Sequence, residues 1–177
     1  MRLSIRIAAI VSSLVLTSGS PARAETSSID GREAMTRALQ GAWLPLESGL
    51  IVGAREGTPL SAKYEIDDGA FQLSVYTSKP GASSGDAFTE IIVDYSAGVV
   101  IRTVPIADDG DLAAAQAQKD AVDRAKRSLA EATADAVKAN VGYRAVSATP
   151  HLDNGRPVAE ITLVRGDEWK IVNERLD

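Results

Sequence analysis

Residues 60–76, LSAKYEIDDGAFQLSVY, decide the fold class of this chain. Apolar and polar residues alternate on both sides of the centre, which is the pattern of two half-buried β-strands. The tripeptide 67–69, Asp-Asp-Gly, suits the tight turn between them, because Gly accepts the positive φ that such turns require. The stretch therefore predicts an antiparallel hairpin with one polar face. We expect Tyr76, Gln72 and Ser74 to lie on that face and to form a contact surface.

Helical and strand patterns flank the hairpin. Residues 46–56 repeat apolar side chains at helical spacing, and Gly49 and Gly53 in this helix would let a sheet approach it closely. Residues 88–94 and 99–104 have the alternation of a second strand pair.

The second half of the chain repeats this order. A long helix is predicted over residues 111–140, with Asp111 as its N-cap and a stripe of small apolar residues, mostly Ala. Strands are predicted at residues 143–149, 157–164 and 169–173. We expect an α+β fold in which helices pack on an antiparallel β-sheet and the order helix, strand, strand, strand occurs twice.

The predicted organisation has four parts. Residues 1–24 have the pattern of a secretory signal peptide, with two Arg, an apolar run of about ten residues and the cleavage motif Ala-Arg-Ala. We expect cleavage after Ala24, a periplasmic or secreted location and no stable membrane anchor, because a bilayer-spanning helix needs about 20 apolar residues. A leader with a short helix at 25–43 precedes two units, at 44–105 and 106–177. The oligomeric state is left open.

Composition excludes several kinds of site. The 177 residues include no Cys and one His, which excludes a disulfide framework, a Cys nucleophile and a two-His metal site. The formal net charge is −5, and without the three Arg of residues 1–24 it is −8, from 16 basic and 24 acidic residues. An anionic protein repels nucleic acid, so that partner is not expected. The sequence contains no cofactor-binding fingerprint or nucleophile motif.

Both units resemble the PepSY-domain family. The resemblance lies in SLAEATADAVKANVGYRAVSATPHLDNGRPVAEITLVRGDEWKIVNERLD at 128–177 and in PLESGLIVGAREGTPLSAKYEIDDGAFQLSVYT at 45–77. The turn VDYSAGV at 93–99 is similar to the family's V-D-x-x-T-G-x segment, although Ala97 replaces the usual Thr. The resemblance implies a small α+β fold of exported bacterial proteins, found also in metalloprotease propeptides, that restrains peptidases or binds peptides. It implies no catalytic residues.

The remaining residues and motifs that could suggest a catalytic, metal or adhesion site are expected to have ordinary roles in the fold. We expect His151 to be a solvated turn residue, since no nucleophile motif lies near it. The segment 108–111 lacks the spacing of a calcium loop. The tripeptide 165–167, Arg-Gly-Asp, lies where a hairpin turn is required. The larger aromatic residues are expected in the core or between helix and sheet: Trp43, Trp169, Phe71 and Phe88.

These observations favour a non-enzymatic exported binding protein without cofactor or metal. Its expected partner is a secreted peptidase or another envelope protein, held at an exposed sheet edge or on the polar sheet face. The alternative is a periplasmic carrier of a small ligand or a cell-envelope component, which a sizeable apolar pocket would favour. An enzyme is the third possibility, and it would need Glu65, Glu90 and Asp94 to meet in one cleft. Asp67 and Asp68 are further candidates for such a carboxylate pair. Glu65 and Asp67 lie on the polar strand face, where their ordinary role is solvation.

Overall fold

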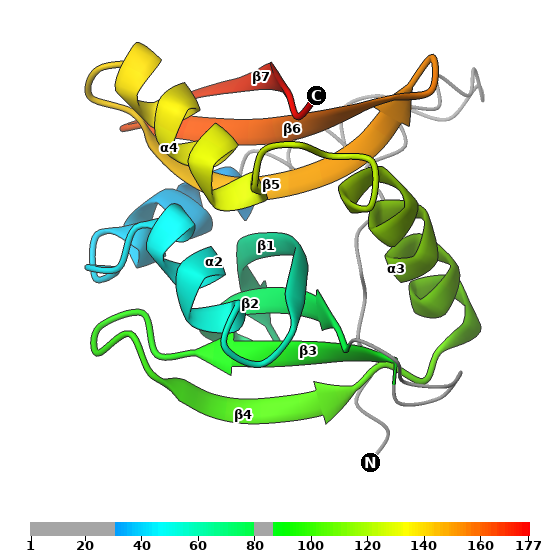
Figure 1. Ribbon diagram of the computed structural model, residues 1–177. Coiled ribbons are helices and arrows are strands. Elements are labelled where there is room, and N and C mark those ends of the chain that lie inside the picture. The colour runs from blue at the N-terminus through cyan, green and yellow to red at the C-terminus, as the bar shows by residue number, and fades with distance from the viewer. Residues whose placement is uncertain (1–30, 80–86) are drawn as a thin grey trace, which may run out of the picture.

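The computed structural model describes residues 31–79 and 87–177, so the predicted signal peptide and the start of the leader lie outside the described residues. After a helical segment at residues 31–39, the elements in chain order are α2 (Leu46–Gly53), β1 (Thr58–Asp67), β2 (Ala70–Ser78), β3 (Phe88–Val93), β4 (Val100–Pro105), α3 (Asp109–Val122), α4 (Leu129–Ala139), β5 (Arg144–Asp153), β6 (Arg156–Arg165) and β7 (Glu168–Arg175) (Figure 1). The predicted α+β class, with helices packed on an antiparallel sheet, is confirmed.

The seven strands form one sheet in the order β4-β3-β2-β1-β5-β6-β7, and all neighbours are antiparallel. Two meanders, β1 to β4 and β5 to β7, meet at the centre of this sheet. Their junction is short: Ala62 pairs with Ala148, and Lys63 pairs with Ser147. The two halves of the chain therefore share one sheet through a narrow seam.

The hairpin predicted over residues 60–76 is confirmed as β1 and β2. Asp68 and Gly69 have φ values of +47° and +80°, as expected for a two-residue turn whose twist matches that of the strands. Asn154 and Gly155 make the same kind of turn between β5 and β6, with φ values of +49° and +79°. Because this turn is so short, β5 continues to Asp153, further than the sequence pattern predicted.

The helices cover the two faces of the sheet unequally. Contacts place α2 on β1 to β3 and α4 on β5 to β7, and the two helices also contact each other. In contrast, α3 lies on the opposite face: Ser61 Oγ of β1 donates to Gln118 Oε1 of α3 at 2.8 Å, whereas the next residue, Ala62, joins the core under α2 and α4. Figure 1 shows α3 apart from the other two helices.

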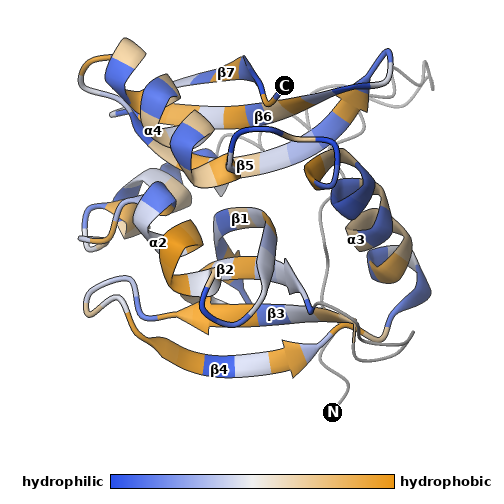
Figure 2. Cartoon of the chain, in the orientation of Figure 1, coloured by the Kyte–Doolittle hydropathy of each residue, from blue (hydrophilic) through white to orange (hydrophobic). Residues whose placement is uncertain are grey.

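Two hydrophobic cores result from this arrangement. The larger core, beneath α2 and α4, contains side chains of both halves, including Leu73 and Ile161. The smaller core lies beneath α3 and consists of Leu60, Tyr76, Phe88, Ile106 and Ala115. Hydrophobic residues are frequent on α2 and β3 and alternate with hydrophilic ones on α3 (Figure 2).

The prediction of one helix over residues 111–140 is wrong, because the chain forms α3 and α4 with a break at 123–128. Ser128 starts α4 with a capping box, in which its hydroxyl accepts from the Glu131 N–H and the Glu131 carboxylate accepts from the Ser128 N–H. The N–H groups of Lys126 and Arg127 donate to the Leu176 carbonyl at 2.6 and 3.1 Å. The break therefore satisfies backbone groups that a continuous helix would satisfy internally.

The predicted N-cap of the first of these helices is also wrong. Asp108, and not Asp111, is the N-cap of α3, since its side chain accepts from the N–H groups of Gly110 and Asp111. The cap lies three residues earlier because the helix begins at Asp109.

The close approach expected at the two helical glycines is confirmed. A Cβ added at Gly49 would lie 2.6 Å from Leu73 Cδ2, and one added at Gly53 would lie 2.5 Å from Val75 Cγ1. Ordinary carbon contacts are about 3.5–4.0 Å long. The backbone of α2 thus packs directly on side chains of β2, and glycine at these positions makes that distance possible.

Candidate binding surfaces

The predicted contact surface of Tyr76, Gln72 and Ser74 is not available to a partner. Tyr76 is 2% exposed, Ser74 is fully buried and Gln72 is half-buried. The alternation of β2 placed them correctly on one face, but α3 folds back over this face and forms the smaller core there. The prediction that these residues bind a partner is therefore wrong.

The same face holds a partly buried network of polar side chains. Lys63 Nζ lies 2.6 Å from Glu65 Oε2, and Ser74 Oγ donates to Glu65 Oε1 at 2.6 Å. Tyr76 Oη donates to Glu90 Oε1 at 3.2 Å. Burial raises the pKa of Glu90, and the negative charge of Glu65 raises it further. Glu90 is only 4% exposed, and its carboxyl group accepts the Tyr76 hydrogen bond inside the fold.

Asp94 does not join the carboxylates of this network. It lies in the turn between β3 and β4, where one carboxylate oxygen accepts from the Ser96 N–H at 2.7 Å and from the Ala97 N–H at 2.9 Å. The hydrogen bonds from Ser96 lower the pKa of Asp94. The three-carboxylate cleft that an enzymatic site would have needed is not formed.

Two further sequence features can be placed on the strands. His151 is exposed as expected, but it lies on β5 opposite Val158 and not in a turn. The tripeptide 165–167 does make the β6–β7 turn, and Arg165 pairs there with Glu168 at 2.7 Å. Among residues 31–79 and 87–177, no group of three or more acidic, His or Cys side chains could hold a metal ion.

Three of the four aromatic residues predicted in the core or between helix and sheet lie there. Phe88 is buried, and Phe71 and Trp169 pack against the larger core. Trp43, however, is 83% exposed, so its predicted core position is wrong. The N–H groups of Trp43 and Leu44 both donate to the Tyr95 carbonyl, which holds this connection at the surface beside the β3–β4 turn.

An exposed apolar surface therefore lies at this end of the sheet. Val99, which follows the turn, is 53% exposed, and Ile101 on the edge strand β4 is 63% exposed. We call Trp43, Val99 and Ile101 the β4 surface. Its exposed apolar side chains and aromatic ring suit contact with another protein.

The two edges of the sheet differ in chemistry. The strand β7 pairs with β6 in unbroken register and has charged residues near both ends, with one large exposed apolar residue, Ile171, at 55%. In β4 the register with β3 shifts between Ile92 and Val93, and the strand ends at Pro105. Charges, bulges and Pro all disfavour pairing at an edge, so contacts to β4 would rely more on side chains than on strand addition.

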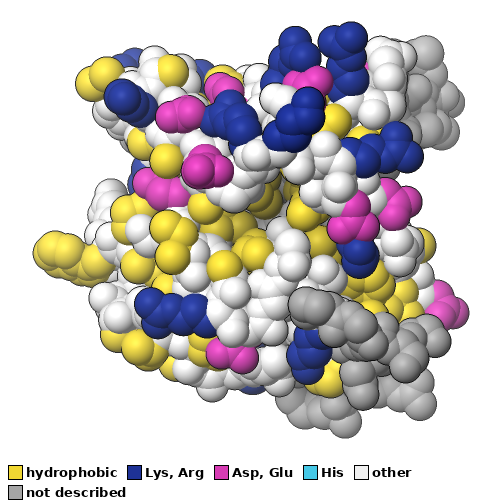
Figure 3. All heavy atoms as spheres, viewed as in Figure 1, with side chains coloured by type: hydrophobic (Ala, Val, Ile, Leu, Met, Phe, Trp, Pro, Cys, Tyr) yellow, Lys and Arg dark blue, Asp and Glu magenta, His cyan; other side chains and the backbone are white. Residues whose placement is uncertain are grey.

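A groove is the second candidate surface. It has a volume of about 400 Å³ and lies between the end of α2, the start of β1, the α3–α4 connection and the end of the chain. Its walls include Leu50, Ala54, Pro59, Val122, Leu129 and Leu176. Figure 3 shows hydrophobic side chains gathered in a hollow at the centre of the molecule. Sequence reasoning gave no signal for this groove, because its residues come from three distant segments.

Comparison with protein-family models, with curated proteins and with solved structures found no match for this chain. No helix in the described ranges is long and apolar enough to cross a membrane. The β4 surface and the groove are therefore assessed from their own geometry.

Proposed function

We propose that the chain is an exported, non-enzymatic binding protein that holds a partner polypeptide, in the first place a secreted peptidase, on the β4 surface. The observation that carries this proposal is the 83% exposure of Trp43 in a connection that is hydrogen-bonded to the β3–β4 turn, together with the exposure of Val99 and Ile101 just after that turn. Trp residues dominate the binding energy of many protein interfaces, because burying one removes a large apolar surface from water. A partner that covers Trp43 would gain most of its affinity there.

Two PepSY-like units are part of this proposal. A helix followed by three antiparallel strands describes the segment from α2 to β3 without β4, and it also describes the segment from α4 to β7. Both helices lie against the larger core, and the first hairpin of each group has a two-residue turn with positive φ. The first strands, β1 and β5, meet antiparallel at the centre of the sheet. These correspondences support a duplicated unit, and the expected activity of such units is restraint of a peptidase.

The test uses residues 25–177 and peptidases exported by the same cells. The wild-type protein is expected to slow one of these peptidases, and the double variant Trp43→Ser, Ile101→Ser is expected to lose the effect. Ile171→Ser is the matched control, because it removes a similarly exposed Ile from the opposite edge. A wild-type protein that neither binds nor slows any of these peptidases would refute the proposal.

A second candidate function is transport of a small ligand. The groove supports it, since small-molecule sites are mostly apolar hollows of about 300–1,000 Å³ and this one has about 400 Å³. The two functions use different surfaces, so each can be tested without the other.

A further inference from the structure

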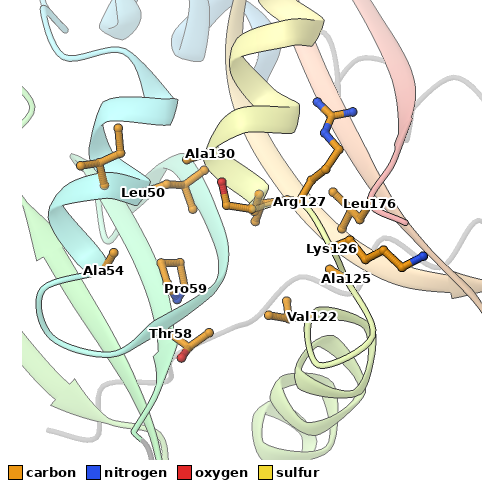
Figure 4. Close-up of a pocket in the computed structure, with 13 residues that line it drawn as sticks. Leu50, Ala54, Thr58, Pro59, Val122, Ala125, Lys126, Arg127, Ala130 and Leu176 are labelled. Atoms are coloured by element: carbon orange, nitrogen blue, oxygen red, sulfur yellow. The ribbon is translucent and has the colours of Figure 1, made fainter.

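The walls of the groove are apolar on both sides. Leu50 of α2 and Ala54, the C-cap of that helix, lie on one side, and Val122, Ala125 and Ala130 lie on the side of α3 and α4 (Figure 4). Leu50 and Leu129 are buried members of the larger core, so the floor of the groove continues into that core. Such a site favours an apolar chain over a polar or sugar-like ligand.

The two charged residues of the groove, Lys126 and Arg127, lie next to each other at one end. The backbone of Lys126 and Arg127 is fixed by hydrogen bonds to the Leu176 carbonyl, and their aliphatic stems line the wall. In Figure 4 their charged ends point away from Leu50 and Pro59, on the opposite side. The apolar chain and a charged head of one ligand would thus contact different parts of the groove.

The two cationic residues at this end differ in their ion pairs. Arg127 pairs with Asp135 at 2.6 Å. Lys126 is exposed and makes no ion pair with any of the described residues. An uncompensated cation beside an apolar groove is notable in a chain with a net charge of −5, and it complements an anionic head group.

We propose that the groove binds an amphiphile with one alkyl chain and a carboxylate head, as in a fatty-acid anion. The alkyl chain would lie between α2 and the α3–α4 connection, and the carboxylate would meet Lys126 Nζ at the mouth. This inference rests on the second candidate function and specifies the ligand class of its site.

The alkyl chain is expected to supply most of the affinity. Each methylene removed from water strengthens binding about four-fold, until the chain outgrows the groove. The exposed Lys126 is expected to add only a few-fold, because solvent and salt screen an ion pair at the surface.

The test is a calorimetric titration of residues 25–177 with octanoate, decanoate and dodecanoate, each below its critical micelle concentration, and it measures the affinity for each. The wild-type affinity is expected to rise steeply with chain length. Lys126→Glu is expected to weaken dodecanoate binding about three- to ten-fold and to leave binding of neutral dodecanol unchanged. Lys138→Glu is the matched control. Lys138 is exposed, lies near the other end of α4 and does not line the groove, so this substitution makes the same change of charge outside it.

A groove-filling variant, Ala54→Phe, is expected to weaken both dodecanoate and dodecanol, because residue 54 is exposed and lines the groove. Three results would overturn the proposal: no dodecanoate binding to the wild type, affinity that does not depend on chain length, or equal losses in the two Lys variants. Loss of peptidase binding in Ala54→Phe would assign the groove to the polypeptide partner instead. Failure of the fatty-acid test leaves the Trp43 test intact, so the two proposals fail separately.

Discussion

Replacing Gly53 by Ala tests the packing of α2 on the sheet. The new Cβ would lie 2.5 Å from Val75 Cγ1 and 3.2 Å from Val75 Cβ. Since carbon atoms in contact are about 3.5–4.0 Å apart, the helix or Val75 must move by about 1 Å. Val75 is fully buried in the larger core, so its neighbours resist that movement.

Two opposing effects set the magnitude. Overpacking a core costs about 1–3 kcal/mol, whereas Ala in place of Gly favours a helix by up to about 1 kcal/mol. Gly53 is the last residue of α2, so the gain in helix propensity is small. We expect Gly53→Ala to lower the free energy of unfolding by about 1–2 kcal/mol, as the difference of these two effects.

The assay is urea denaturation of residues 25–177, followed by circular dichroism. Gly31→Ala is the control, because among residues 31–79 and 87–177 the added Cβ would meet no atom within 4 Å apart from its chain neighbours and the backbone of its own helical segment. Val75→Ala removes the clashing methyl groups, so the double variant Gly53→Ala, Val75→Ala is expected to lose less stability than the sum of the single variants. A stabilising effect of Gly53→Ala, or strict additivity in the double variant, would refute the close packing described above.

Three further predictions concern buried and capping groups. Because burial raises the pKa of Glu90 above its ordinary value of 4.5, the folded state holds this proton more tightly than the unfolded state, and the wild type loses stability as the pH rises above that value. Glu90→Gln cannot ionise and is therefore expected to gain stability relative to the wild type as the pH rises from 4.5. A difference in urea midpoint that does not change with pH would contradict this. Ser128→Ala removes a capping box and is expected to cost about 1 kcal/mol in thermal unfolding, whereas no change would mean that the α3–α4 break is held elsewhere. Arg144 donates to the carbonyls of Leu39 and Ala42 at 2.8 and 3.0 Å, so Arg144→Ala is expected to speed amide exchange in residues 31–44 selectively, and uniform exchange would argue against this anchoring.

The β-hairpins could be predicted because their signal is local. The Asp-Asp-Gly turn and the alternation around it lie within residues 60–76, and the strands form there as predicted. The break between α3 and α4 also has a local signal, the Ser-x-x-Glu capping box of residues 128–131. The stripe of small apolar residues continues across the break, however, and this stripe led to the prediction of one continuous helix. A helical stripe shows which face is buried and not whether the helix is continuous.

The candidate surfaces could not be predicted, because they depend on contacts between distant segments. Tyr76 lies on the expected face of β2, and only the return of α3 over that face buries it. Trp43 has a large apolar side chain, which favoured a core position, yet hydrogen bonds to the Tyr95 carbonyl hold its segment at the surface. The groove combines residues 50–59, 122–130 and 176, whose proximity follows from the topology of the whole sheet.

Amide hydrogen exchange of the protein alone and in complex with the peptidase that it slows tests the central proposal most directly. The β4 surface predicts slower exchange, on binding, in residues 99–105 and in the connection around Trp43, with β7 unchanged. Protection confined to β7, or no protection at either edge in a saturated complex, would contradict the proposed function.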